Sequence, residues 1–94
     1  MKIEWSKDAD ISYNETIVYW AEHNFSNAYS EKIISETRKI EKSISENPYF
    51  LTRYHENIGL YQRIFFKGKF SLYYRIANNI VRIIHFRSNR QRPL

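Results

Sequence analysis

The amino-acid sequence predicts an α+β fold, in which an N-terminal strand leads into a two-helix hairpin that packs on a small antiparallel sheet. Two observations support this prediction. In the first half of the 94 residues, apolar side chains recur at the spacing of a helix face, whereas in the second half β-branched and aromatic residues gather in short runs. The predicted order is strand, helix, helix, strand, strand, strand, in a single domain spanning residues 1–94.

The chain opens with a short strand that leads into a helix. Polar and apolar residues alternate over residues 2–5, as in a half-buried strand. Ser6 offers a helix N-cap, and Asp8 and Asp10 follow where the helix dipole favours negative charge. We therefore expect a helix over residues 7–22. Its core-facing residues share one side of a helical wheel: Ala9, Tyr13, Thr16, Ile17 and Trp20.

Ile11 and Val18 lie on the other side of this first helix, where they form either a second buried contact or part of a surface for a partner. Residues 24–27 supply a turn and a second cap. The helix that follows must end before Pro48, because a residue that precedes proline avoids the helical region. The apolar face of this second helix is Tyr29, Ile33, Thr37, Ile40 and Ile44.

Three strands are predicted in the second half, over residues 60–66, 70–77 and 80–87, because these runs are rich in β-branched and aromatic residues. Hairpin turns separate them at residues 67–69 and 78–79. Asparagine, which occupies the second of these turns, tolerates the positive φ that a two-residue hairpin demands. The sequence therefore predicts a three-stranded antiparallel meander.

In one of these strands the alternation of residues predicts which side chains face the core. In another strand it does not distinguish the buried face from the exposed one. Residues 49–59, before the meander, have no regular period. In residues 70–77, the apolar face holds Phe70, Leu72, Tyr74 and Ile76, and the open face holds Ser71, Tyr73, Arg75 and Ala77. In the last strand both alternating sets mix apolar and cationic residues, so the pattern does not choose the buried set. The two sets are Val81, Ile83, His85 and Arg87, and Arg82, Ile84 and Phe86.

Charge divides unequally between the two halves of the chain. Residues 1–50 hold nine acidic and six basic residues, whereas residues 51–94 hold nine basic residues and only one acidic residue, Glu56. The two halves therefore carry net charges of −3 and +8. Seven of the eight arginines lie in the second half, and the planar guanidinium of arginine binds phosphate or carboxylate with two hydrogen bonds. A dense positive charge of this kind attracts a phosphate backbone, an acidic membrane surface or an acidic protein partner.

Several classes of chemistry are excluded or disfavoured. The chain has no cysteine, so disulfide and thiolate chemistry are excluded, and a reducing compartment is expected. His23, His55 and His85 lie too far apart in sequence for the usual spacing of metal ligands, and we expect no metal and no other cofactor. The chain has neither an apolar signal core nor a run of about 20 apolar residues, so we expect a cytoplasmic protein that does not enter a membrane.

A cationic and aromatic surface remains as the candidate functional site. Such a surface binds nucleic acid by charge and stacking, and it cleaves RNA if a base, an acid and a cation converge on one phosphate. The plainer interpretation is that Tyr73 and Tyr74 pack in the sheet and that His85 is a satisfied edge residue. The candidate surface comprises Arg63, Arg75, Arg82, His85, Arg87, Arg90 and Arg92, with Tyr61, Tyr73 and Tyr74 nearby.

Short motifs follow one another along the chain in a recognisable order. They are Trp5-Ser6 with Ala9, Tyr19-Trp20 in the first helix, Pro48 after the second helix, Arg63, the run 70–76 with sequence FSLYYRI, and the last strand with Arg90, Gln91 and Pro93 after it. In order and spacing these motifs resemble the RelE/ParE superfamily of toxins from bacterial type II toxin–antitoxin (TA) modules. The resemblance covers essentially the whole chain.

This resemblance implies a small cytotoxic protein that a co-encoded antitoxin holds inactive in a hetero-oligomer. In the family, the C-terminal segment of the antitoxin wraps the toxin and covers its basic face. Carried over to this chain, the implied antitoxin contacts are Ile11, Val18, Arg75 and Arg87. The sequence leaves open the identity of the antitoxin and the oligomeric state.

The family also offers two targets. RelE-like members cleave mRNA in the ribosome, whereas ParE-like members block DNA gyrase. RelE-like ribonucleases typically carry an arginine where this chain has Ser71, and a tyrosine or histidine in the tail, which here is the basic segment 88–94. We therefore expect a ParE-like gyrase inhibitor that binds its target through Arg63, Tyr73, Arg75, Arg82, Arg87, Arg90 and Arg92. The alternative is a ribosome-dependent mRNA endonuclease that uses Arg63, His85, Arg87 and Arg90.

Overall fold

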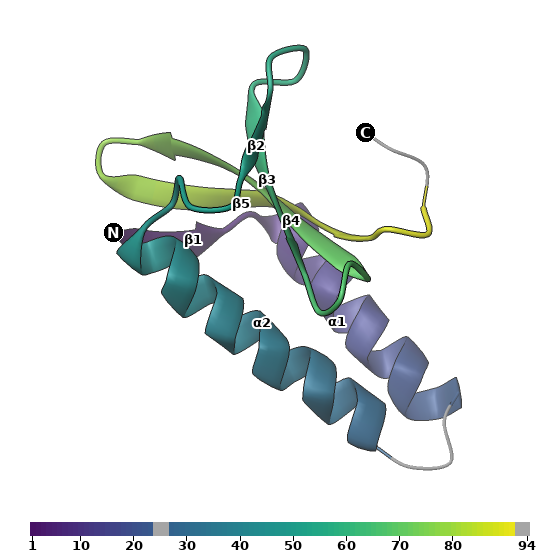
Figure 1. The fold of residues 1–94 in the computed structure, drawn as a ribbon. Coiled ribbons are helices and arrows are strands. Elements are labelled where there is room, and N and C mark those ends of the chain that lie inside the picture. The colour runs from purple at the N-terminus through teal and green to yellow at the C-terminus, as the bar shows by residue number, and fades with distance from the viewer. Residues whose placement is uncertain (24–26, 92–94) are drawn as a thin grey trace.

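The computed structural model describes residues 1–23 and 27–91. A five-stranded sheet with strand order β1-β5-β4-β3-β2 packs on two helices (Figure 1). The elements along the chain are β1 (Lys2–Trp5), α1 (Lys7–His23), α2 (Ala28–Glu46), β2 (Arg53–His55), β3 (Leu60–Phe65), β4 (Phe70–Ala77) and β5 (Ile80–Ser88). Every predicted helix and strand is present, and the predicted α+β fold class is confirmed.

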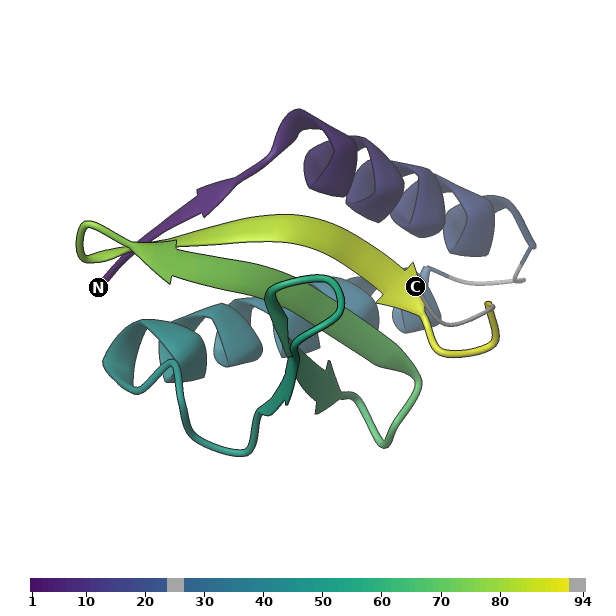
Figure 2. The ribbon, with the colours of Figure 1, turned by 90° about the horizontal axis from the view of Figure 1, so that it is seen from above.

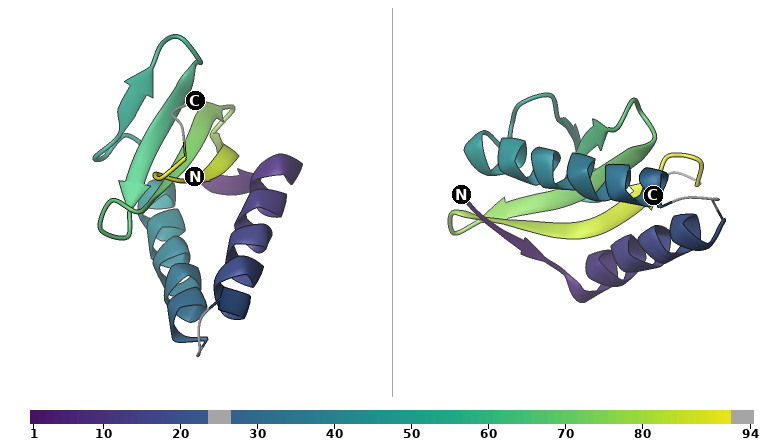
Figure 3. Two further views of the ribbon diagram at one scale, coloured as in Figure 1. Left: turned by 90° about the vertical axis from the view of Figure 1, so that its right-hand side faces the viewer. Right: turned by 90° about the horizontal axis from the view of Figure 1, so that it is seen from below.

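The helices begin and end where the local signals place them. The Ser6 hydroxyl accepts a hydrogen bond from the Ala9 N–H at 3.0 Å, which confirms the predicted cap of α1. α2 ends before Pro48, as predicted. The second predicted cap falls partly on residues 24–26, outside the described residues, and Asn27 itself makes no capping hydrogen bond through its side chain. Figure 3 shows both helices on one side of the sheet.

The sheet differs from the prediction in two strands. β1 pairs in parallel with β5, so the sheet is mixed and not purely antiparallel. β2, a strand that the sequence did not predict, pairs antiparallel with β3 at the opposite edge. Three residues are too few to show a period, and β2 is held by backbone pairing with β3 across a turn that ends at Gly59, with φ +67°.

The two predicted hairpin turns are present. Asn78 and Asn79 have φ values of 53° and 62°, which confirms the predicted two-residue turn between β4 and β5. The turn between β3 and β4 is longer than predicted, because β3 ends at Phe65 and Phe66 already has positive φ. β5 also extends to Ser88, so the tail predicted to begin at residue 88 begins one residue later.

A bulge in β5 decides which side chains enter the core. Tyr73 pairs with His85 and Tyr74 pairs with Ile83, so Ile84 is an extra residue that reverses the alternation of the strand. Val81 and Ile83 are buried before the bulge, and Phe86 is buried after it. The buried set therefore draws on both of the alternating sets, and neither set alone was the correct choice.

The hydrophobic core lies between the helices and one face of the sheet. β4 contributes its predicted apolar residues Phe70, Leu72 and Tyr74, and Ile76 packs against them. Trp5 and Trp20 are only partly buried, at the margin of this core. The other fully or nearly fully buried members are Ala9, Ile33, Ile40, Ile44, Phe65, Val81, Ile83 and Phe86. The opposite face of the sheet carries no helix, as the view from above also shows (Figure 2).

Candidate functional site

The uncovered face of the sheet gathers four of the eight arginines of the chain together with His85. Across β4 and β5, three cross-strand pairs on this face include a cationic residue or a histidine: Ser71 with Arg87, Tyr73 with His85, and Arg75 with Arg82. The register of β2 with β3 adds Arg53, because it pairs with Gln62, which in turn pairs with Tyr73. We call the set Arg53, Arg75, Arg82, His85 and Arg87 the cationic face.

Arg75 and Arg82 form an unusual pair within the cationic face. They lie directly opposite each other on neighbouring strands, where two like charges destabilise a sheet. In the described part of the chain, neither has a carboxylate within salt-bridge distance. An anion placed between the two guanidinium groups would relieve their repulsion, so the pair favours a phosphate or carboxylate ligand.

Tyr73 lies between two histidines on the same face. Its ring centroid is 6.0 Å from that of His55 and 6.3 Å from that of His85. Burial lowers the pKa of His85, and the charge of Arg87 lowers it further, whereas Asp8 acts in the opposite direction. The imidazole of His85 is therefore mainly neutral at pH 7 and able to accept a proton.

A chain of hydrogen bonds crosses the sheet beside this tyrosine. His55 Nε2 donates to Gln62 Oε1 at 2.7 Å, and Gln62 Nε2 donates to the Ser71 hydroxyl at 2.9 Å. The Ser71 hydroxyl then donates to Asn89 Oδ1 at 2.6 Å. Ser71 is completely buried by these neighbours, and Tyr73 is only 7% exposed. The open face predicted for β4 is therefore exposed only from Arg75 onward.

Arg63 lies on the core side of the sheet. It is 7% exposed and pairs across the sheet with the core residue Leu72. Its guanidinium donates to the Phe50 carbonyl at 2.9 Å and to the Ser43 hydroxyl at 3.2 Å. The predicted position of Arg63 on the cationic surface is therefore wrong: strand alternation turns its side chain inward, and it joins α2 to the segment before β2.

Tyr74 also belongs to the core, as the plainer interpretation of the sequence had it. Its ring is fully buried, and its hydroxyl donates to the Pro48 carbonyl at 2.6 Å. Burial raises the pKa of Tyr74 to about 12, although the nearby charge of Arg63 opposes the shift. The hydroxyl thus keeps its proton and its hydrogen bond at physiological pH.

The basic tail is described only in part. Arg90 is exposed beyond the end of β5, where it lines a groove together with Thr16 and Tyr19 of α1. Arg92, predicted to bind the target, lies outside the described residues.

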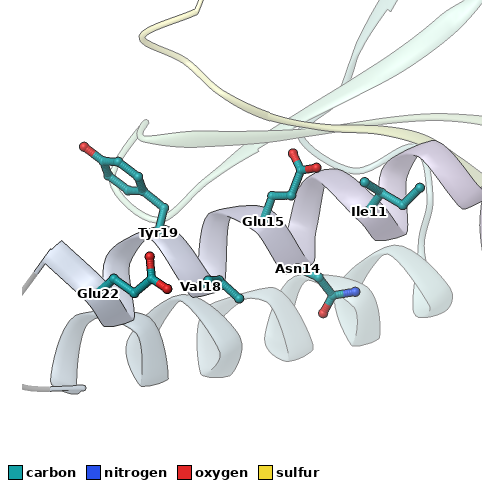
Figure 4. A pocket seen from close by; sticks show the side chains of 6 residues that line it. All are labelled: Ile11, Asn14, Glu15, Val18, Tyr19 and Glu22. Carbon is teal, nitrogen blue, oxygen red and sulfur yellow. The ribbon is translucent and has the colours of Figure 1, made fainter.

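The outer side of α1 exposes apolar side chains. Ile11 and Val18 are 44% and 53% exposed, so they do not form the second buried contact that the sequence left open. Tyr19, 50% exposed, extends the same surface (Figure 4). We call Ile11, Val18 and Tyr19 the α1 stripe. It is bordered by Asn14, Glu15 and Glu22.

Two residues of the candidate site were missed by the sequence analysis. His55 and Arg53 reach the cationic face through β2, a strand without a detectable period. In residues 1–23 and 27–91, no three His, Cys, Asp or Glu side chains gather into a possible metal site. None of the helices in these residues is long and apolar enough to span a bilayer.

Comparison with known proteins supports the fold. No protein-family model matches the sequence, and no curated protein is significantly similar to it. Among solved structures, a chain of the chromosomal ParDE TA system from P. aeruginosa superposes with a TM-score of 0.77. That match has 12% sequence identity and covers 94% of this chain and 95% of the other. At this identity the likeness shows a shared fold.

Proposed function

We propose that this protein is the toxin of a type II TA module and that it acts in the cytoplasm, where a co-encoded antitoxin neutralises it. The observation that carries the proposal is the presence of two uncovered surfaces of opposite character, the apolar α1 stripe and the cationic face. The fold shared with a chain of a ParDE TA system supports the same assignment.

The antitoxin contacts follow from these two surfaces. An amphipathic segment with an apolar side fits the α1 stripe through Ile11 and Val18. An acidic stretch of the same partner fits Arg75 and Arg87 on the cationic face, where it relieves the repulsion between Arg75 and Arg82. Toxin and antitoxin then form a hetero-oligomer.

The proposed toxic activity is inhibition of DNA gyrase by binding. Two features of the chain disfavour RNA cleavage. Arg63 is buried and has a structural role, and a completely buried Ser71 stands where RelE-like ribonucleases carry an arginine. The residues left for the target are Arg75, Arg82, Arg87, Arg90 and Arg92, with the edge of Tyr73.

One observation favours the ribonuclease as a second candidate. Tyr73 lies between His55 and His85, and Arg87 is a strand neighbour of His85. In a cleavage step, neutral His85 would take the proton of a 2′-hydroxyl as its oxygen attacks phosphorus. Arg87 would stabilise the charge on the phosphate, and the Tyr73 hydroxyl would give a proton to the departing 5′-oxygen.

A single set of variants separates these candidates. We expect wild-type protein to arrest growth, to inhibit supercoiling by purified gyrase and to leave ribosome-bound mRNA intact. Arg87→Ala and Arg90→Ala should weaken supercoiling inhibition, whereas His85→Ala should leave it nearly unchanged, because binding needs no proton transfer. Lys39→Ala, on the exposed side of α2, is the matched control.

Two results would contradict the gyrase assignment. Cuts at fixed codon positions in mRNA from arrested cells, abolished by His85→Ala, would instead establish the ribonuclease. Normal growth of cells that make the folded protein in the absence of any antitoxin would reject the toxin assignment itself.

A further inference from the structure

We propose that the connection between α2 and β2 is a preformed docking loop, which seats apolar side chains in an apolar pocket of the protein that the toxin inhibits. The loop comprises residues 47–52. It protrudes between the end of α2 and the start of β2, apart from α1 (Figure 2). This inference rests on the proposed toxin function and assigns a target contact outside both the α1 stripe and the cationic face.

The loop exposes a dense group of large apolar side chains. Tyr49, Phe50 and Leu51 are 57%, 52% and 72% exposed, and Tyr54, which follows the loop in the middle of β2, is 51% exposed. Four side chains of this size at half exposure present roughly 400 Å² of surface. That area is about half of what one partner buries in an interface of standard size. The loop can therefore form the centre of an interface, with neighbouring residues at its rim.

Side chains of the protein hold the backbone of the loop in place. Three successive carbonyl groups each accept a hydrogen bond from a side chain. The Pro48 carbonyl accepts from the Tyr74 hydroxyl at 2.6 Å, the Tyr49 carbonyl from the Thr52 hydroxyl at 3.1 Å, and the Phe50 carbonyl from Arg63 at 2.9 Å. Two of the three donors are core residues, so the conformation of the loop is tied to the folded core and exists before any partner binds.

The backbone of the loop is strained at Leu51. Leu51 has φ +51°, a conformation that is unfavourable for a residue with a side chain. The Arg63 guanidinium lies 5.6 Å from the centre of the Phe50 ring, which adds a cation–π contact beside the carbonyl hydrogen bond. Tyr49 packs against Tyr61 in an edge contact, with ring centroids 5.6 Å apart. A loop pinned in this way presents its side chains with little loss of entropy on binding.

The surroundings of the loop identify its occupant. Tyr54 pairs with Tyr61 on the core side of the sheet, opposite to the face that carries Arg53. The charged side chains around the loop are Glu46 and Glu56, which are acidic, and Arg53 and the buried Arg63, which are basic. The region therefore lacks the excess of cations that a nucleic acid or an acidic antitoxin segment requires. The apolar side chains of this protruding, nearly neutral loop are therefore expected to make the contacts with the inhibited protein. A shallow apolar pocket on a folded protein complements such a tip.

The test replaces apolar side chains at the tip. It removes the cation–π contact of Phe50 with Arg63 but leaves in place the three side chains that donate hydrogen bonds to the loop carbonyls. The variant Phe50→Ser/Leu51→Ser should keep the wild-type circular dichroism and melting temperature, because both side chains are exposed. We expect its binding to purified gyrase and its inhibition of supercoiling to fall by about ten-fold or more, which is the effect of losing an interface hot spot. Growth arrest should be relieved in parallel, whereas co-purification with the antitoxin should be unchanged.

Ile58→Ser is the matched control. Ile58 is 36% exposed and lies in the turn between β2 and β3, outside the loop, so this variant should inhibit as the wild type does. A toxic wild type together with an equally toxic and inhibitory Phe50→Ser/Leu51→Ser variant would overturn the docking loop and leave the proposed function standing. If the Phe50→Ser/Leu51→Ser variant lost self-association but still inhibited gyrase, the loop would instead mediate a contact between two copies of the protein. That result would also overturn the docking proposal. A non-toxic wild type would reject the proposed function and this inference with it.

The side chains that donate hydrogen bonds to the loop carbonyls give a second test, which does not change the exposed residues of the loop. Tyr74→Phe removes only the hydroxyl that holds the Pro48 carbonyl. We expect amide hydrogen exchange to rise about ten-fold in residues 49–52 and to stay unchanged in α1. Inhibition should weaken less than in the tip variant. Unchanged exchange in the loop would show that it is not held by the core and would contradict a preformed surface.

Discussion

The two faces of the sheet contain similar residues and use them differently. Arg63 and Arg75 lie on neighbouring strands, yet Arg63 is buried and donates hydrogen bonds to a carbonyl and a hydroxyl, whereas Arg75 is exposed opposite Arg82. Tyr73 and Tyr74 are adjacent in sequence, yet the first meets histidines and the second supports a loop from the core. Residue type alone therefore does not separate a structural arginine or tyrosine from one available to a partner.

The largest expected contrast between the two faces is in β4. Leu72 is fully buried, so Leu72→Ala should lower the free energy of unfolding by about 2–5 kcal/mol. Arg75→Ala on the other face should change it by less than about 0.5 kcal/mol, and relief of the repulsion with Arg82 favours the stabilising direction. Urea unfolding of both variants measures the difference. Equal losses would mean that the assigned faces of β4 are wrong.

A second contrast concerns the buried and exposed arginines. Arg63→Met leaves the Phe50 carbonyl and the Ser43 hydroxyl without their donor, and we expect a loss of about 2–3 kcal/mol in unfolding free energy. Arg53→Met removes an exposed guanidinium and should stay within about 0.5 kcal/mol of the wild type. Chemical denaturation of the matched pair is the measurement. A destabilisation by Arg53→Met as large as that by Arg63→Met would contradict the structural role of Arg63.

The pH dependence of stability should report on Tyr74. Its pKa is about 12 in the folded protein and about 10 when unfolded, so unfolding releases a proton between these values. The stability that comes from this tyrosine is therefore complete below pH 10 and is lost as pH rises toward 12, a difference of about 2–3 kcal/mol. Tyr74→Phe should lose about 1 kcal/mol at pH 7 and show a flatter profile above pH 10. Parallel profiles for the two proteins would contradict this assignment.

The smallest expected effect is on the titration of His85. Its pKa is lowered mainly by burial and then by Arg87, with Asp8 opposing. Arg87→Gln should therefore raise this pKa without restoring its ordinary value, because burial persists, and Asp8→Asn should lower it further. NMR titration of the imidazole resolves both changes. A shift in the opposite direction in either variant would place those charges elsewhere relative to His85.

The helices and the meander could be predicted because their signals are local. A helical period over residues 7–22, the Ser6 cap, and the asparagines of the second hairpin each act within a few residues of chain. The missed parts depend on distant residues. β2 exists through its pairing with β3, and the bulge at Ile84 appears only when β5 is aligned with β4. The candidate site was predicted in part. The sequence analysis named Arg75, Arg82, His85 and Arg87, which share a face of the sheet. It missed Arg53 and His55, which reach that face through β2.

By itself the sequence determined the fold class, the order of the main elements and the concentration of positive charge in the second half. Only the tertiary structure decided which arginines face solvent and which polar groups hold the 47–52 loop. The physical reason is the two-residue period of a strand, in which a shift of one position turns every side chain to the other face. That shift is set by pairing and bulges between segments far apart in the chain, and no local pattern contains it.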